Sequence, residues 1–305
     1  MGAHSDVQHS DFTFVAMPPR ISHRRDLTSL SEDFEVVDGE HKFIRTVWAV
    51  LDEDDVAWRG EKDVRKYYIN LPELEAALQR VPDEWLFPEA SPELTVAPND
   101  GAGEDLYIKR PNITRYDPDD ANDGGLPSIP KVLLDEIRIM EFLAEHPHPN
   151  IVRYHGCRVR RGRVTGIVLD RHRTVLDDLE RDESLRASLD RDRIMADLEK
   201  AVAHLHSLGL AHNDLNPSNV VIGENKEAIL IDFGSCQPFG KELLSTGTPG
   251  WVDEDFNSSA KEHDLAALPK IRAWLDNVYE GRPTNLPPMP LDGLRKETLE
   301  ERGLV

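Results

Sequence analysis

The sequence predicts an α+β fold, because short β-branched runs bounded by turn residues occur together with long stretches of helical apolar spacing. The clearest short runs are residues 220–222 and 228–231, which flank the turn-forming residues 223–225 and should pair as a hairpin. The clearest helix ends at Gly209, a natural C-terminal cap, and its apolar stripe comprises Ile194, Leu198, Val202, Leu205 and Leu208. A length of 305 residues suits one two-lobed domain with extensions.

Composition narrows the possible partners. The chain has 36 basic and 57 acidic residues and a net charge of −21, which argues against nucleic acid or an anionic membrane as a partner. Its two cysteines, Cys157 and Cys236, form no disulfide framework and are typical of a reducing compartment. No run of about twenty apolar residues occurs. We therefore expect a cytoplasmic or nuclear protein.

The N-terminal third has few features that indicate chemistry. Residues 1–40 lack periodicity, which predicts a flexible tail with order beginning near His41. Residues 42–51 are rich in β-branched and aromatic residues and predict a strand. A short helix should follow at Pro72, a residue favoured in a first helical turn.

The middle of the chain predicts strands around one helix. Residues 94–97 and 106–109 should form a hairpin with residues 99–103 as its turn, and two further strands should flank Arg161-Gly162. Between them, residues 130–144 have helical spacing, and Glu136 lies beside the apolar face. A carboxylate that points toward a core needs a cation, because an unpaired buried charge is costly.

Three polar residues converge at the hairpin of residues 220–231. Asp214 and Asn219 lie before its first strand, and Asp232 follows its second strand, so all three should emerge at the same end. Two carboxylates and an amide supply the hard oxygen ligands that suit Mg²⁺, which also keeps waters and binds substrate phosphates.

These residues carry a family resemblance. His212-Asn213-Asp214, Asn219 and Asp232-Phe233-Gly234 resemble the catalytic core of the protein kinases in order and spacing. The alternative is a buried polar hairpin in another α/β fold. The resemblance implies a two-lobed protein kinase-like fold, with a mainly β N-lobe that carries one key helix and a reduced, mainly helical C-lobe.

The resemblance also implies roles for individual residues. Asp214 would accept the proton of the substrate hydroxyl, Asn219 and Asp232 would hold Mg²⁺, and His212 would pack beneath Phe233. Lys109, paired with Glu136, would bind the α- and β-phosphates of ATP. The catalytic set would therefore be Asp214, Lys109 and Asn219. The nucleotide-binding set would be Lys109, Glu136, Leu169, Asp170, His172 and Asp232, with Leu169 at the back wall and backbone groups of residues 170–172 meeting adenine.

The C-terminal part resembles the kinase activation segment and the helix after it. Residues 247–254 resemble the end of that segment. Ser259 and Glu262 have capping-box spacing, so a helix should start there. Asp264 matches the kinase aspartate that braces the catalytic loop, and Pro269 should kink or end the helix.

Four departures from the kinase pattern stand out. No Gly-x-Gly-x-x-Gly occurs, and Asn216 stands where Ser/Thr kinases carry a lysine. Asn213 replaces the arginine that receives an activation-loop phosphate, so phosphorylation of Ser245, Thr246 or Thr248 should not be needed. Only 30 residues follow Leu275, which leaves out the late helices. With these departures, the chain resembles the small, C-terminally truncated kinase-like proteins of filamentous fungi.

We divide the chain into five parts on this basis. They are a flexible tail (1–40), an N-terminal elaboration of the small lobe (41–93), the N-lobe and hinge (94–172), a truncated C-lobe (173–280) and a C-terminal tail (281–305).

The leading function is ATP- and Mg²⁺-dependent phosphoryl transfer to a hydroxyl, with a protein Ser/Thr as acceptor. The alternatives are a pseudokinase that binds nucleotide or a protein without turnover, and a small-molecule phosphotransferase of the aminoglycoside-kinase type.

Overall fold

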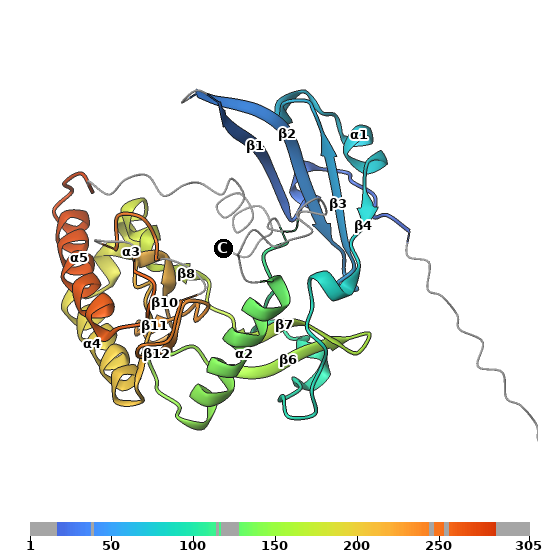
Figure 1. Ribbon diagram of the computed structural model, residues 1–305. Helices are drawn as coiled ribbons and strands as arrows, with labels where there is room; N and C mark the ends of the chain where they lie inside the picture. Colours follow the sequence, from blue (N-terminus) through green and yellow to red (C-terminus); the bar gives the residue numbers. More distant parts are fainter. Residues whose placement is uncertain are drawn as a thin grey trace, which may run out of the picture.

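The fold has two β-sheets at one end and a pair of long helices at the other (Figure 1). The computed structural model describes residues 17–37, 40–113, 116, 128–243, 247–252 and 256–284. The four-stranded sheet lies above the three-stranded sheet that is formed by residues 106–109, 154–160 and 163–170, and the helix pair lies to one side of both (Figure 1). This is an α+β architecture of the expected class.

The N-terminal sheet is antiparallel and is ordered β1 (Ser29–Val37), β2 (Glu40–Leu51), β3 (Ala57–Lys62) and β4 (Gln79–Arg80). Helix α1 (Leu71–Ala76) begins at Asn70, whose side chain accepts from the Glu73 amide, so the helix expected at Pro72 is confirmed. The core between α1 and the sheet includes Trp48, Trp58 and Leu74.

The expected start of order at His41 was wrong. Strand β1 lies inside the region assigned to the tail, and it pairs along its length with β2. Its sequence is acidic and only weakly alternating, so its strand conformation depends on pairing with β2, which a local pattern does not reveal. Residues 1–16 and 38–39 lie outside the described residues.

The second sheet has the order β5 (Leu106–Lys109), β7 (Arg163–Asp170), β6 (Tyr154–Arg160), and α2 (Ile129–Glu145) packs against it. The hairpin expected around Arg161-Gly162 is confirmed. Both turn residues have positive φ, 50° and 73°, which matches the right-handed twist of a two-residue hairpin.

The hairpin expected between residues 94–97 and 106–109 was wrong. β5 pairs with β7, and Val96 instead forms an isolated parallel bridge with Cys157. The hairpin does not form because residues 99–103, which were expected to be its turn, adopt another conformation. Asn99, Asp100 and Gly101 all have left-handed φ and lie in a short 3-10 helix. That winding does not reverse the chain as a hairpin turn would.

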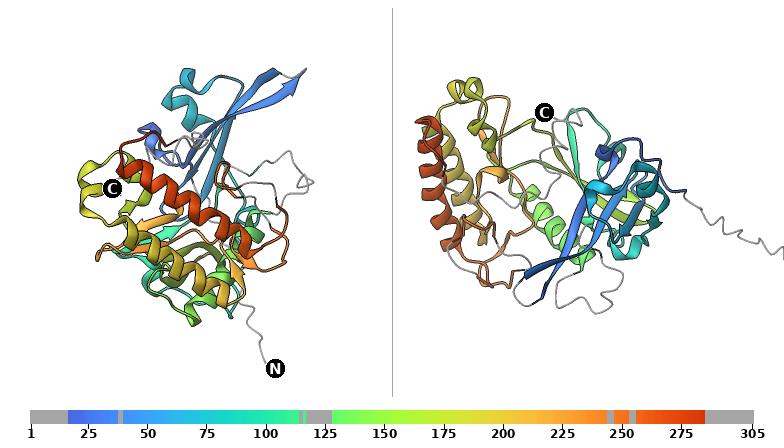
Figure 2. Two further views of the ribbon diagram at one scale, coloured as in Figure 1. Left: turned by 90° about the vertical axis from the view of Figure 1, so that its left-hand side faces the viewer. Right: turned by 90° about the horizontal axis from the view of Figure 1, so that it is seen from above.

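The C-terminal part is mainly helical. It contains α3 (Glu183–Ser188), α4 (Arg191–Ser207) and α5 (Lys261–Tyr279), and α4 and α5 lie side by side (Figure 2). Two small sheets have the orders β11-β10-β8 and β12-β9, and their strands are β8 (Thr174–Val175), β9 (Leu210–Ala211), β10 (Val220–Ile222), β11 (Ala228–Leu230) and β12 (Gln237–Pro238). The predicted β10–β11 hairpin and the end of α4 before Gly209 are confirmed.

Helix α5 lacks the predicted side-chain cap, and it does not end at Pro269. Ala260 precedes its first turn without a side-chain cap, because the Ser259 hydroxyl donates to the Gln237 carbonyl. Pro269 lies inside the helix, which continues to Tyr279. The burial of Trp274 and Leu275 beyond the proline favours continuation, since tertiary packing supplies most helix stability. Among the described residues, each helix is too short or too polar to span a bilayer.

Candidate active site

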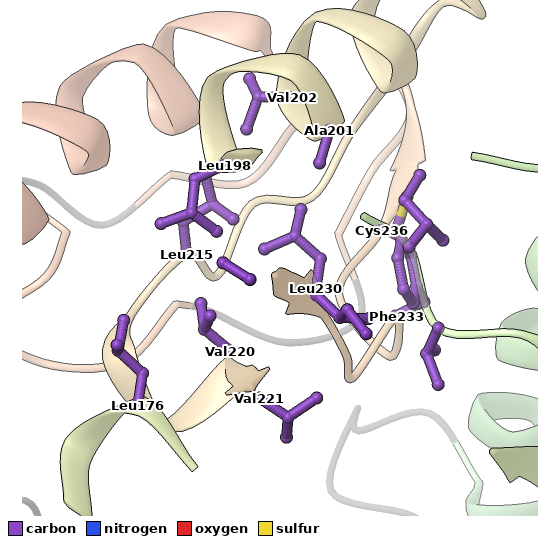
Figure 3. Close-up of a cluster of buried hydrophobic side chains, with 14 of the residues drawn as sticks. Leu176, Leu198, Ala201, Val202, Leu215, Val220, Val221, Leu230, Phe233 and Cys236 are labelled. Atoms are coloured by element: carbon purple, nitrogen blue, oxygen red, sulfur yellow. The ribbon is translucent and has the colours of Figure 1, made fainter. Parts of the chain in front are cut away.

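The β10–β11 hairpin brings the predicted polar residues to one end. Val220 lies opposite Leu230, so the chain before β10 and the chain after β11 emerge together. The Asn219 side-chain amide donates to the Asp214 carboxylate at 3.0 Å and to the Asp214 carbonyl at 2.8 Å. Leu230 and Phe233 point into the apolar cluster that holds this hairpin against α4 (Figure 3). A packed core thus fixes the positions of these polar side chains.

Lys109 joins the two halves of the structure. Its Nζ lies 2.5 Å from Glu136 Oε1 on α2 and 2.9 Å from Asp232 Oδ1 after β11. Burial alone would lower the pKa of Lys109, but the charges of Asp232 and Glu136 outweigh it and raise this pKa. Glu136 is 7% exposed, and its burial raises its own pKa, so the carboxylate depends on the lysine as its cation. The pair expected from the sequence is therefore formed, with Asp232 as a third member.

Hydrogen bonds to Asp264 fix the backbone of His212 and Asn213. Asp264 is fully buried and accepts from the backbone amides of His212 and Asn213, each at 2.9 Å. His206 Nε2 lies 2.9 Å from the same carboxylate. The His212 ring packs edge-on against Phe233, with centroids 5.2 Å apart. The expected brace by Asp264 and the contact of His212 with Phe233 are both confirmed.

Asn213 forms several buried hydrogen bonds, whereas the sequence analysis noted only that it replaces an arginine. Its side chain is 2% exposed, and its Nδ2 donates to the carbonyls of Ala211 and Ser235 at 2.9 Å each. Its Oδ1 accepts from His263 Nδ1 at 2.9 Å. The residue has φ 64°, a conformation that asparagine tolerates better than arginine. Asparagine at a turn before a strand was the available signal.

The Asp214 carboxylate accepts hydrogen bonds from three residues. Besides Asn219, the Thr248 amide donates to Oδ1 at 2.7 Å and Asn216 Nδ2 donates to the same atom at 3.2 Å. Asn216 Nδ2 also lies 3.2 Å from the Thr248 hydroxyl. Asn216, which stands where the kinase resemblance places a lysine, contacts Asp214, and the contact of Thr248 was not expected. These bonds fix the orientation of the carboxylate.

The hinge expected at residues 170–172 connects β7 to β8. Leu169 is buried, and burial lowers the pKa of His172. The Asp170 carboxylate lies 2.6 Å from His155 Nε2, and the Asp170 amide donates to the Arg153 carbonyl. That amide is therefore engaged within the protein.

Tyr107 is an exposed aromatic residue of β5 that the sequence analysis did not consider. It lies two residues before Lys109 on β5, so both side chains project from the same face of the strand. Its cross-strand partner is Leu169 at the hinge, and the tyrosine is 42% exposed. The alternation of side chains along β5 could have indicated this arrangement, because it places Tyr107 on the same face as Lys109.

The donor set fits a magnesium ion better than a transition metal. Within the described part of the chain, no group of three His, Cys, Asp or Glu residues could hold a metal by itself. Asn219 uses its amide nitrogen toward Asp214, so its Oδ1 can serve as a ligand beside Asp232. Two oxygen ligands suit Mg²⁺, which takes its remaining ligands from water and phosphates.

Comparisons with known proteins agree with this geometry. A family model described as the protein kinase domain matches residues 115–256. The chain is 28% identical over 174 residues to the serine/threonine-protein kinase max-2 of Caenorhabditis elegans, which covers 54% of this chain and 25% of that protein. It is 34% identical over 118 residues to the human serine/threonine-protein kinase/endoribonuclease IRE2, covering 34% of this chain and 13% of that protein.

A third relative is the LEAF RUST 10 disease-resistance locus receptor-like protein kinase-like 1.2 of Arabidopsis thaliana, 30% identical over 128 residues. That match covers 39% of this chain and 20% of the relative, so the chain spans a quarter or less of these three proteins. Lys109 and Asp264 lie outside residues 115–256 and are placed by the structure alone. Through the matched kinase domain and the fold around it, the chain is similar to the protein kinase-like superfamily.

Proposed function

We propose that this protein transfers a phosphoryl group from ATP to a hydroxyl acceptor, with Mg²⁺ as cofactor and a protein serine or threonine as acceptor. The observation that carries the proposal is the bridge from Lys109 to both Glu136 and Asp232. A lysine held between two carboxylates presents a fixed positive charge in the cleft, where it can bind phosphate oxygens.

In the proposed reaction Asp214 accepts the proton of the acceptor hydroxyl while the hydroxyl oxygen attacks the γ-phosphorus. The bond to the β-phosphate oxygen then breaks and ADP leaves. Bound Mg²⁺ would neutralise phosphate charge, and Asn219 and Asp232 are the residues that would hold it. Lys109 would orient the α- and β-phosphates, and the hydrogen bonds of Asn219 and Asn216 would aim the Asp214 carboxylate at the acceptor.

One observation favours nucleotide binding without turnover as the second candidate. The Thr248 amide and Asn216 Nδ2 both donate to Oδ1 of Asp214, so this oxygen is already engaged. In an active enzyme Oδ2 would take the proton, and in a binding module neither oxygen would. A small-molecule acceptor remains the third candidate, and the acceptor panel described below distinguishes it.

We also propose the lobe boundaries. Residues 94–172 would form the N-lobe and hinge, and residues 173–280 would form the C-lobe. The elaboration would begin at residue 17, because β1 belongs to its sheet. Two free, buried cysteines support a reducing cytoplasmic or nuclear location.

The deciding experiment is a phosphoryl-transfer assay with labelled ATP and Mg²⁺ against a peptide panel and a metabolite panel. Wild type should phosphorylate one class, and Asp214→Asn should lose that activity by at least roughly a hundredfold while still binding nucleotide. Transfer that survives in Asp214→Asn would refute the assigned role. Binding without transfer in wild type would select the binding module.

A further inference from the structure

The turn between β2 and β3 carries Asp55, whose carboxylate points from the N-terminal sheet toward the second sheet. Asp55 lies in this turn with φ 57°, and its side chain is fully buried. Asp52 fixes the turn, because its Oδ1 accepts from the amides of Asp54 at 3.0 Å and Val56 at 2.8 Å. The turn therefore holds Asp55 in a left-handed conformation that few residue types adopt without cost.

Asp55 meets the second sheet through three side chains. Arg110 Nε lies 2.8 Å from Oδ1, Arg158 Nε lies 2.8 Å from Oδ2, and the Thr165 hydroxyl donates to Oδ2 at 2.7 Å. A buried carboxylate is stable only with such partners. Arg161 adds to the junction by donating to the Asp55 carbonyl at 2.9 Å. The N-terminal sheet is thus fastened to β6, to β7 and to the residue after β5 (Figure 1).

Arg110 connects this junction to the cleft because it directly follows Lys109. Successive side chains of an extended chain point to opposite sides, so Lys109 faces Glu136 and Asp232 while Arg110 faces Asp55. β5 has four residues and pairs with β7 alone among the described strands. A short edge strand of this kind has few other restraints at its end.

We propose that Asp55 is a positioning residue for Lys109. The N-terminal sheet, through the ion pair of Asp55 with Arg110, holds the end of β5 so that the Lys109 ammonium stays between Glu136 and Asp232. The inference rests on the proposed function for its consequence in nucleotide binding, but the placement of Lys109 can be measured without nucleotide. It gives residues 17–87 a role in the site although none of them reaches the cleft.

The test compares two arginines that share one carboxylate. Arg110→Lys and Arg158→Lys each weaken a contact with Asp55, but only Arg110 adjoins Lys109. The readout is the acylation rate of Lys109 by an amine-reactive ester, followed by mass spectrometry in the absence of nucleotide. Unfolding in urea is measured on the same samples, so that the two variants are compared at known stability.

We expect Arg110→Lys and Asp55→Asn to raise Lys109 labelling severalfold, because a lysine that is no longer held between Glu136 and Asp232 is accessible to the ester. Arg158→Lys should lower stability while leaving Lys109 labelling at the wild-type rate. Equal labelling in wild type and Arg110→Lys, or an equal rise in Arg158→Lys, would overturn the proposal. If Asp55→Asn does not fold, the two arginine variants decide the matter.

A parallel titration with Mg²⁺-ATP separates this inference from the proposed function. If wild type binds no Mg²⁺-ATP, the phosphotransferase proposal fails, and the labelling ratios still judge the role of Asp55. If wild type binds, Arg110→Lys should weaken binding more than Arg158→Lys does. The reverse order would contradict the positioning role.

Discussion

The backbone amide of Thr248 donates a 2.7 Å hydrogen bond to Oδ1 of Asp214, across 34 residues of sequence. This bond ties the segment after β12 to the proposed catalytic carboxylate. The sequence indicated only that phosphorylation of Thr248 should not be needed, and the contact gives this residue a place at the site. Ser245 and Thr246, which were grouped with it, lie outside the described residues, as does Glu254.

Thr248→Glu should reduce phosphoryl transfer by roughly tenfold or more, because a second carboxylate beside Asp214 adds like-charge repulsion at the site. Thr248→Ser keeps the hydroxyl near Asn216 and should retain near wild-type transfer. Initial rates at saturating ATP provide the measurement. Activity in Thr248→Glu at or above that of Thr248→Ser would show that the segment moves away during turnover.

Asp232→Ala should abolish stabilisation of the protein by Mg²⁺-ATP. A ligand that binds only the native state at a hundred times its Kd stabilises it by about 2.7 kcal/mol, so wild type should show a clear rise in Tm. Asp214→Asn is the matched control and should keep that rise, since Asp214 contacts the acceptor rather than the nucleotide. A wild-type Tm that does not change in saturating Mg²⁺-ATP would contradict nucleotide binding.

Tyr107→Ala should weaken ATP binding, and Tyr107→Phe should not. The ring lies on the Lys109 face of β5 next to the hinge, where a purine base can stack on it. Stacking of a base on an aromatic side chain contributes about 1–3 kcal/mol, or roughly fivefold to a hundredfold in Kd. Calorimetric titration measures the difference. Tighter binding by Tyr107→Ala would mean that the ring obstructs the base.

Asn213→Ala should lower the free energy of unfolding by about 2–3 kcal/mol, because it leaves several buried hydrogen-bonding groups without partners. Asn213→Gly loses the same bonds but relieves the positive φ, so it should cost roughly 1 kcal/mol less than the alanine variant. Urea unfolding measures both. Equal values for the two would argue that the backbone conformation adjusts, and values equal to wild type would argue against the network.

Stability should fall as pH falls from 6.5 toward 5. Burial lowers the pKa of His263 below its ordinary 6.5, and nearby Asp264 and Glu262 oppose this only in part. Above pH 6.5 the imidazole is neutral in both states, and below it the unfolded chain takes up the proton first, so stability is lost until the pH passes the folded pKa. Burial lowers the pKa of His148 and His172 in the same direction.

His263→Gln should reduce the slope of unfolding free energy against pH between 6.5 and 5. The remaining slope reports the other two histidines. Urea midpoints at half-unit steps of pH provide the measurement. A slope as steep in His263→Gln as in wild type would show that His263 does not take part.

The sequence predicted those parts of the site that follow one another closely along the chain. The β10–β11 hairpin placed Asp214, Asn219 and Asp232 because its turn residues and β-branched runs are adjacent. The pairing of Lys109 with Glu136 followed from the need of a buried carboxylate for a cation, together with the kinase resemblance. These inferences needed only local patterns and one rule about buried charge.

The missed features depend on contacts between distant residues or on backbone angles. The buried role of Asp55 was missed, because its arginine partners lie 55 and 103 residues away. The hydrogen bonds of Asn213 were not predicted, because their partners Ser235 and His263 are distant in the sequence. The winding at Asn99 and Asp100 depends on left-handed φ values that the composition of the turn alone did not specify.

The N-terminal sheet also bears on the order in which the chain assembles during synthesis. Its strand pairings all lie within residues 29–80, so they can form before the rest of the chain has left the ribosome. Asp55 then has no arginine partner until residue 110 emerges, and its pocket closes only after residue 165 has been added. A half-made chain therefore carries an unpaired carboxylate that stays hydrated, and translation must pass Thr165 before the two sheets can be joined.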